Sequence, residues 1–291
     1  MLNLNQVFNE LALDTDVAQL VRCSVVSAIE FYNVYCTMHN VAGSTNVHGE
    51  SQKGLDILAD DIFIKQFLDS GLCSLICSEE QPEAIESTGQ LAVCFDPLDG
   101  SSVIEANFAT GSVLGVYRAD DVIGLSPRQM QVAFYFVYGP NLTLTIASKD
   151  KVFAGKLTDT GWELDVVEPL QKDAVLALGN FQLLNDADIY KKVQKMLDFN
   201  LSLRYSGALV SDVHMLIVKS GGIFVRPSCA KKPPKLRLLY ECGPLAFIVE
   251  ALGGTSFADG KSILDTEITN LHQTVDFLLG NDSLVREWLE A

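Results

Sequence analysis

The sequence predicts an α/β fold on three observations. Apolar residues recur with the helical period over residues 16–39 and again over 55–68. Two short apolar runs, at 75–77 and 91–95, have the length of buried strands, and each leads directly into carboxylates. A β-rich stretch over 111–152 is followed by a second unit in which helical and strand patterns alternate. We therefore expect two α/β sublayers in one unit.

Two helices and a run of strands account for the N-terminal half. Asp14 and Asp16 stand before the first helical pattern, where an acidic side chain favours a helix N-terminus. The second pattern stops near Gly71, a typical residue after a helix end. Strands are expected at 112–117, 131–138 and 142–148, with Gly139-Pro140-Asn141 as the turn between the last two.

The composition turns polar over 155–170, and a second unit begins near Ala174. Periodicity predicts its helices at about 185–197, 207–219 and 243–252, and its strands at 223–226, 254–257 and 277–279. We expect the two domains to meet between residues 165 and 166.

The composition is that of a globular chain with an acidic surface. The 291 residues carry a formal charge of −16, and 48% of them are apolar, which is ample for a buried core. Because there is too little basic surface to release counterions from a phosphate backbone, we expect no nucleic-acid partner. No run approaches the roughly 18 apolar residues that span a bilayer, so we expect no membrane association.

Cysteine usage and the N-terminus indicate a cytoplasmic location. Seven cysteines, an odd number set mostly in apolar segments, are typical of reduced thiols. The first residues lack the basic and apolar blocks of a secretory leader. A plastid location would require a leader removed from upstream of Met1.

The stretch 95–102, Phe-Asp-Pro-Leu-Asp-Gly-Ser-Ser, predicts a metal site joined to a phosphate cradle. Pro97 biases Asp96 toward extended geometry, and Gly100 relaxes the backbone, so the carboxylates of Asp96 and Asp99 and the Leu98 carbonyl can converge on one cation. Hard oxygen ligands of this kind suit Mg²⁺, with Mn²⁺ as a substitute.

A second pair of carboxylates, Glu79 and Glu80, also follows an apolar strand. If the two strands are neighbours, four acids share one small volume, and their repulsion costs several kcal/mol unless they bind protons or metal. Taken alone, Glu79-Glu80 is more typical of a solvated acidic turn. Beside Asp96 and Asp99 we favour the metal site.

These segments together resemble the fructose-1,6-bisphosphatase and sedoheptulose-1,7-bisphosphatase family, within the lithium-sensitive, metal-dependent sugar phosphatases. The similarity covers nearly the whole chain and implies a layered α-β-α-β-α sandwich of the sugar phosphatase type. The segments that carry it are 43–46 (Gly-Ser-Thr-Asn), 55–60 (Leu-Asp-Ile-Leu-Ala-Asp), 78–80 (Ser-Glu-Glu), 95–102, 203–207 (Leu-Arg-Tyr-Ser-Gly), 212–214 (Asp-Val-His) and 235–241 (Lys-Leu-Arg-Leu-Leu-Tyr-Glu).

The resemblance implies a role for each residue of the site. It implies two to three Mg²⁺ ions per site, a water activated by Glu80 coupled to Asp56, and a scissile 1-phosphate bound by Gly100, Ser101 and Ser102 at a helix N-terminus. The implied metal ligands are Glu50 (for a third ion), Glu79, Asp96, the Leu98 carbonyl, Asp99 and Glu241. The expected domains are an N-terminal α+β metal-site domain at 1–165 and a C-terminal α/β substrate-binding domain at 166–291.

The resemblance also implies a sugar bisphosphate substrate and a homo-oligomer, a dimer or tetramer. Lys235 and Tyr205 would bind the distal phosphate and the sugar, with Arg204 reaching in from a neighbouring subunit. From composition alone, Arg204 is equally well a surface residue and Lys235 an ordinary loop lysine. His214, on an apolar helical segment, is expected in the core and outside the site.

Arg226 departs from the pattern of fructose bisphosphatases, which carry a tyrosine at this position. A guanidinium reaches further and binds phosphate bidentately, so we favour sedoheptulose 1,7-bisphosphate as substrate. Gln90-Leu91 replaces the Lys-Tyr pair that helps bind AMP in animal enzymes, so AMP inhibition is not expected.

Other functions stay open. Within the family they are fructose-1,6-bisphosphatase or dual specificity; outside it, inositol monophosphatase-like activity or a non-catalytic sugar-phosphate sensor or scaffold. Asp96 as a covalent phosphoryl acceptor is disfavoured because metal ligation already occupies it.

Overall fold

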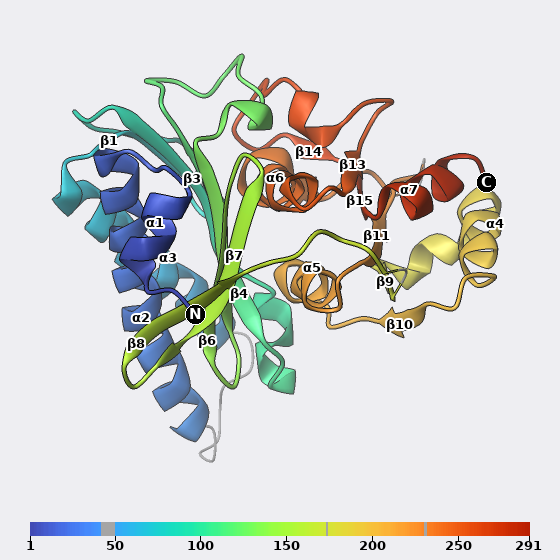
Figure 1. Cartoon of the computed structure of the whole chain (residues 1–291), viewed down its shortest axis with the longest axis horizontal. Helices are drawn as coiled ribbons and strands as arrows, with labels where there is room; N and C mark the ends of the chain where they lie inside the picture. The colour runs from blue at the N-terminus through green and yellow to red at the C-terminus, as the bar shows by residue number, and fades with distance from the viewer. Residues whose placement is uncertain (42–49, 173, 230–231) are drawn as a thin grey trace.

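The structure, a computed structural model, describes residues 1–41, 50–172, 174–229 and 232–291. Within these ranges it describes the side chains of all residues except 38–41, 50–53, 181 and 183. It contains two large sheets separated and flanked by helices (Figure 1). The first sheet has, in spatial order, β2 (Ile85–Glu86), β1 (Cys73–Ser78), β3 (Leu91–Asp99), β4 (Thr110–Tyr117), β5 (Val132–Tyr138), β6 (Leu142–Ser148), β7 (Lys151–Thr158) and β8 (Gly161–Val166). Among its described strands, only β1 and β3 pair in parallel.

The second sheet is smaller and mixed. Its strands, in spatial order, are β10 (Ser202–Arg204), β9 (Val175–Leu178), β11 (Gly222–Arg226), β15 (Phe277–Gly280) and β13 (Thr255–Phe257). A separate two-stranded pair joins β12 (Leu236–Arg237) to β14 (Thr274–Val275). Short 3₁₀ turns are η1 (Ser101–Ala106), η2 (Pro127–Gln129), η3 (Phe181–Asn185) and η5 (Ile263–Asp265).

Helices cover the outer face of each sheet and fill the space between the sheets (Figure 1). The outer layers are α1 (Leu4–Glu10), α2 (Thr15–Val41) and α3 (Glu50–Ser70) on the first sheet, and α4 (Ala187–Met196) and α7 (Asp282–Leu289) on the second; the middle layer is α5 (Leu209–Val218) and α6 (Gly243–Ala251). Three hydrophobic clusters fill the four spaces between the five layers: one lies under each outer helix layer, and the third surrounds the middle helices and reaches both sheets. The α-β-α-β-α sandwich predicted from the resemblance is confirmed.

The strand and helix predictions of the N-terminal half hold with small changes of boundary. The Asp14 carboxylate accepts a hydrogen bond of 2.9 Å from the Val17 N–H and caps α2. The second helix is longer than its apolar pattern, since α3 begins at Glu50. Phe95 of β3 packs on Phe63 and Phe67 of α3, with ring centroids 5.6 and 5.4 Å apart, which holds this helix over the centre of the sheet.

The polar stretch at 155–170, for which no strand was predicted, is largely sheet. It contains the end of β7 and all of β8, the outermost strands of the first sheet. Phe153 and Leu164 pack in the core against the N-terminal helices, whereas Lys151 and Asp165 are exposed. Strands at an open edge keep polar residues on their uncovered side, so their composition resembles that of a loop.

None of the helices over the described ranges is both long and apolar enough to span a bilayer.

Candidate active site

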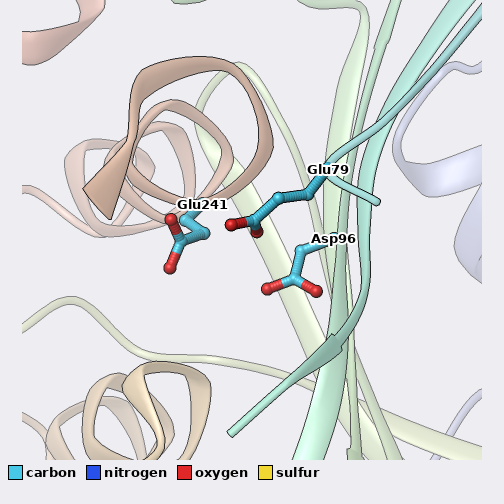
Figure 2. A group of neighbouring side chains, drawn as sticks. All are labelled: Glu79, Asp96 and Glu241. Carbon is cyan, nitrogen blue, oxygen red and sulfur yellow. The ribbon is translucent and has the colours of Figure 1, made fainter. Parts of the chain in front are cut away.

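Three carboxylates from distant parts of the sequence meet between the two sheets. One oxygen each of Glu79, Asp96 and Glu241 lies within 4.8 Å of the others. Figure 2 shows Glu79 and Asp96 extending from the first sheet toward Glu241, which extends from the turn before α6. Because β1 and β3 are parallel neighbours, with Ser78 opposite Phe95, the residues that follow Ser78 and Phe95 emerge at the same edge.

The Asp-Pro-Leu-Asp segment is held by an irregularity in β3. The pairing of β3 with β4 shifts between Asp96 and Asp99, as at a β-bulge, and bulges re-aim side chains beside active sites. The Leu98 N–H donates to the Asp96 carboxylate at 2.9 Å, and the Val210 N–H at the start of α5 donates to Asp99 at 2.7 Å. Leu98, between the two aspartates, is buried.

Glu241 is positioned by η4 (Leu238–Cys242), a π-helical turn directly before α6. The Gly243 N–H donates to the Leu238 carbonyl, five residues back, and a Cβ at position 243 would lie 2.7 Å from that carbonyl oxygen, so only glycine fits. Single π turns of this kind are frequent at functional sites.

Arg237 links two of the three carboxylates, although no sequence pattern assigned a separate role to it. Its backbone N–H donates to the Glu241 carboxylate at 2.6 Å, and its Nε lies 3.8 Å from Glu79 Oε1. The guanidinium partly offsets the negative charge of Glu79. The position of Arg237, four residues before the predicted ligand Glu241, could have indicated this role.

Burial and mutual repulsion make this group of acids costly to ionise. Burial first, and then the charges of Glu79, Asp99 and Glu241, raise the pKa of Asp96 well above its usual range. Burial and the charges of Glu79 and Asp99 do the same to the pKa of Glu241, and burial raises the pKa of Asp99 to about 7. An all-carboxylate set whose like charges need neutralising fits a hard divalent cation.

Asp56 lies between Glu80 and the predicted phosphate cradle. Burial, followed by the charge of Glu80, raises the pKa of Asp56 to about 6, while a hydrogen bond with the Ser101 side chain acts in the opposite direction. Glu80 is at the surface, and partial burial and the charge of Asp60 raise its pKa. The two residues predicted to handle the water proton are therefore close enough to interact.

The cradle residues begin η1. Gly100 has a φ of 84°, and a Cβ there would lie 2.3 Å from the Ala208 Cβ, so the turn requires glycine. Ser101 and Ser102 then occupy the first turn, and the backbone N–H groups of a first turn point out of the N-terminal end of a helix. This supports the predicted helix N-terminus, here a short 3₁₀ turn.

The residues predicted to bind the distal phosphate are divided between two places. Arg226, at the end of β11, is close enough for its charge to lower the pKa of Glu241, and exposed Lys235 stands two residues before Arg237. Arg204 and Tyr205 are exposed on or next to β10, the edge strand of the second sheet, and Arg204 donates to the Leu203 carbonyl. No contact in the described chain joins Arg204 to the acids.

Other predictions fall outside the site or outside the described residues. His214 is half-buried beside the core: its Nδ1 lies 2.9 Å from the Tyr135 hydroxyl, and burial lowers its pKa to about 4, so it is neutral. The side chain of Glu50 and the segment 43–46 lie outside the described residues. A cavity of about 700 Å³ between α6 and the start of β5 contains none of the predicted site residues.

The layered fold and the acidic centre between its sheets define the class: a two-sheet α/β protein with a site suited to divalent metal. Family models for the N-terminal and C-terminal domains of fructose-1,6-bisphosphatase match residues 11–162 and 171–291. The chain therefore belongs to the fructose-1,6-bisphosphatase family, as the sequence motifs predicted.

Similar proteins carry both substrate names of this family. The chain is 35% identical over 245 residues to chloroplastic sedoheptulose-1,7-bisphosphatase of Spinacia oleracea, covering 81% of this chain but only 63% of that protein. It is 34% identical to class 1 fructose-1,6-bisphosphatase of Campylobacter curvus, covering 97% of this chain and 92% of that one. These relatives do not decide between seven-carbon and six-carbon substrates.

Solved structures agree on the fold. Fructose-1,6-bisphosphatase of Leishmania major superposes with a TM-score of 0.85 at 28% identity, covering 96% of this chain and 94% of that one. A protein described as putative sedoheptulose-1,7-bisphosphatase of Toxoplasma gondii gives 0.88 at 24% identity over 100% and 98% of the two chains.

Proposed function

We propose that this protein is a Mg²⁺-dependent sugar bisphosphate 1-phosphatase that hydrolyses sedoheptulose 1,7-bisphosphate to sedoheptulose 7-phosphate and phosphate. One observation carries the proposal: the carboxylates of Glu79, Asp96 and Glu241, two of them buried, cluster beside the segment that leads into the glycine-serine-serine turn at the start of η1. A phosphate monoester dianion repels anionic nucleophiles, so its hydrolysis needs cations and positioned donors.

The acidic residues divide into ligands and a base. Glu79, Asp96, Asp99, Glu241 and the Leu98 carbonyl would hold two ions, and Glu50 a third. Bound Mg²⁺, or Mn²⁺ in its place, would supply Lewis acidity and lower the pKa of water. Glu80 would take the proton of the attacking water, with Asp56 beside it and hydrogen-bonded to Ser101.

The substrate would be held at both ends. Gly100, Ser101 and Ser102 would donate to the scissile 1-phosphate. Lys235, Tyr205 and Arg226 would bind the sugar and the distal phosphate, together with Arg204 of a second copy. This last role requires a homo-oligomer, and exposed Arg204 on the edge strand β10 is compatible with it.

Phosphate release from the two bisphosphates tests the proposal directly. Mg²⁺-dependent release is expected from sedoheptulose 1,7-bisphosphate, with a higher kcat/KM than for fructose 1,6-bisphosphate. Equal or faster turnover of the six-carbon substrate would assign the protein as a fructose-1,6-bisphosphatase or a dual-specificity enzyme, which the Campylobacter relative favours. Tight binding without hydrolysis would indicate a sugar-phosphate sensor instead.

Arg226→Tyr is expected to shift preference toward the six-carbon substrate by about tenfold, since tyrosine is shorter and cannot form a charged, bidentate contact with phosphate. The readout is the ratio of kcat/KM for the two bisphosphates. Arg226→Lys is the control, because it keeps the positive charge near Glu241. An unchanged ratio in Arg226→Tyr would show that Arg226 does not set chain-length selectivity.

A further inference from the structure

Asp60 is a buried carboxylate whose role the proposed chemistry does not explain. It lies on α3 and is only 2% exposed. The Ser78 hydroxyl donates to its Oδ1 and the Gln81 side-chain amide donates to its Oδ2, both at 2.5 Å. Over the part of the chain whose side chains are described, no salt bridge reaches it. Burying a carboxylate without a cation costs folding free energy, and an apolar side chain in the same place would cost less.

The two donors belong to the turn that carries Glu79 and Glu80. A carboxylate is acceptor-only, so the Ser78 hydroxyl must donate to Asp60 and present its lone pairs elsewhere. One of them accepts the Glu80 backbone N–H at 3.2 Å. The direction of this hydroxyl, and with it the placement of the Glu80 backbone, is therefore fixed by Asp60.

The far end of the turn is held in the same way. The Gln81 N–H donates to the Ser78 carbonyl at 3.3 Å, while its side chain donates to Asp60. The Gln81 carbonyl in turn accepts from His272 Nε2 at 3.0 Å, and the His272 ring packs on Tyr240, next to Glu241. The turn is thus braced between α3 and the segment that precedes α6.

We propose that Asp60 is a positioning residue, which fixes the turn 78–81 so that Glu79 and Glu80 face the metal centre. The inference rests on the proposed function for its catalytic consequence. Asp60 itself would touch neither metal nor substrate. Groups that orient the ligands of a metal are typically worth about 10 to 100-fold in metal affinity or activity.

Asp60→Leu tests the proposal, since leucine keeps the branched shape of the side chain but removes both acceptors. We expect kcat to fall by about 10 to 100-fold and the Kd for Mn²⁺ to rise by about tenfold, with KM for the bisphosphate within about threefold. The Tm should stay level or rise, because a buried charge is gone. Asp61→Leu is the matched control: it makes the same replacement at the exposed next position and should behave as wild type.

Asp60→Asn is the conservative rescue. Its Oδ1 can accept from Ser78, and its amide can donate to Gln81 once the Gln81 amide turns over, so kcat and Mn²⁺ affinity should lie within about threefold of wild type. A folded Asp60→Leu protein with wild-type kcat and Mn²⁺ affinity would overturn the proposal. So would an Asp60→Asn protein as impaired as Asp60→Leu, or an Asp60→Leu protein whose losses follow a large fall in Tm.

Mn²⁺ titration of the full chain separates this inference from the proposed function, because it needs no substrate. A wild-type protein that binds Mn²⁺ but hydrolyses neither bisphosphate would refute the function. The Mn²⁺ affinities of Asp60→Leu and Asp60→Asn would still decide whether Asp60 positions the turn.

Discussion

Glu80→Gln is expected to lower kcat by about 10² to 10⁴-fold, the range that a positioned general base contributes. Glutamine matches glutamate in size but cannot take the proton of the attacking water. Since Glu80 is not among the three clustered carboxylates, Mn²⁺ affinity and KM for the bisphosphate should stay within about threefold. Steady-state phosphate release at saturating Mg²⁺, with Mn²⁺ titration of the same protein, measures both quantities.

Glu83→Gln is the matched control, since Glu83 follows the same turn but is exposed and contributes to none of the raised pKa values of the site. It should retain the wild-type rate. If Glu80→Gln also turns over at the wild-type rate, the base is another group, and Asp56 is then the first candidate because of its pKa of about 6.

Half of the acidic centre could be predicted from local sequence. Glu79 and Asp96 each follow a short apolar run, and such runs are often adjacent strands. The parallel pairing of β1 and β3 then brings both to one edge. The prediction required only that the two runs form adjacent parallel strands.

The other half depends on contacts that no pattern in the sequence shows. Glu241 lies far along the chain, and only the family resemblance assigned it to the site. Arg237 was missed because its part depends on the backbone of η4, which aims its N–H at Glu241. Asp60 was missed because a buried carboxylate in a helix looks like any other polar residue until Ser78 and Gln81 are placed against it.

Two kinds of secondary structure were missed for different reasons. β8 is an edge strand of the first sheet and β7 is its neighbour, and both carry exposed polar residues, so their polar composition hid them. Helix α7 could have been predicted from the sequence, because Leu284, Val285 and Trp288, which are buried, recur with the helical period. Edge exposure conceals a strand, whereas a short amphipathic helix near a chain end is detectable.

Asp96→Asn is expected to abolish turnover, by at least about 10³-fold, yet to stabilise the metal-free protein. The activity should be lost because a neutral amide replaces a carboxylate that we propose as a metal ligand. The stability is gained because Asp96 is buried among Glu79, Asp99 and Glu241, and a neutral side chain relieves their repulsion. Stability and function therefore change in opposite directions at this residue, as is usual for strained functional sites.

The stability of the metal-free protein should depend on pH in a direction that shows whether the buried carboxylates repel one another. Folding raises the pKa of Asp99 to about 7 and the pKa values of Asp96 and Glu241 well above their usual range, so the folded chain binds more protons than the unfolded chain between pH about 4 and pH about 7. His214, whose pKa folding lowers to about 4, opposes this trend by about one proton, but the three acids together outweigh it, so stability should fall as pH rises through this window. Asp14, Asp265 and Asp282 have lowered pKa values, and the stability that they contribute is lost only as pH falls toward their folded values, below this window.

Thermal unfolding in EDTA and in excess Mg²⁺, at about pH 5 and about pH 8, measures both effects. In EDTA the wild-type Tm should be lower at the higher pH by roughly 5 °C, and Asp96→Asn should recover much of that loss. Mg²⁺ should raise the wild-type Tm, more at high pH than at low, and leave Asp96→Asn nearly unchanged. Asp61→Asn, which removes one exposed negative charge, should follow wild type in every condition.

A metal-free wild-type Tm that rises between the two pH values would mean that the acids do not repel one another in the folded protein. The cluster would then need no cation to neutralise it, and the physical case for a metal centre at the end of β3 would be lost.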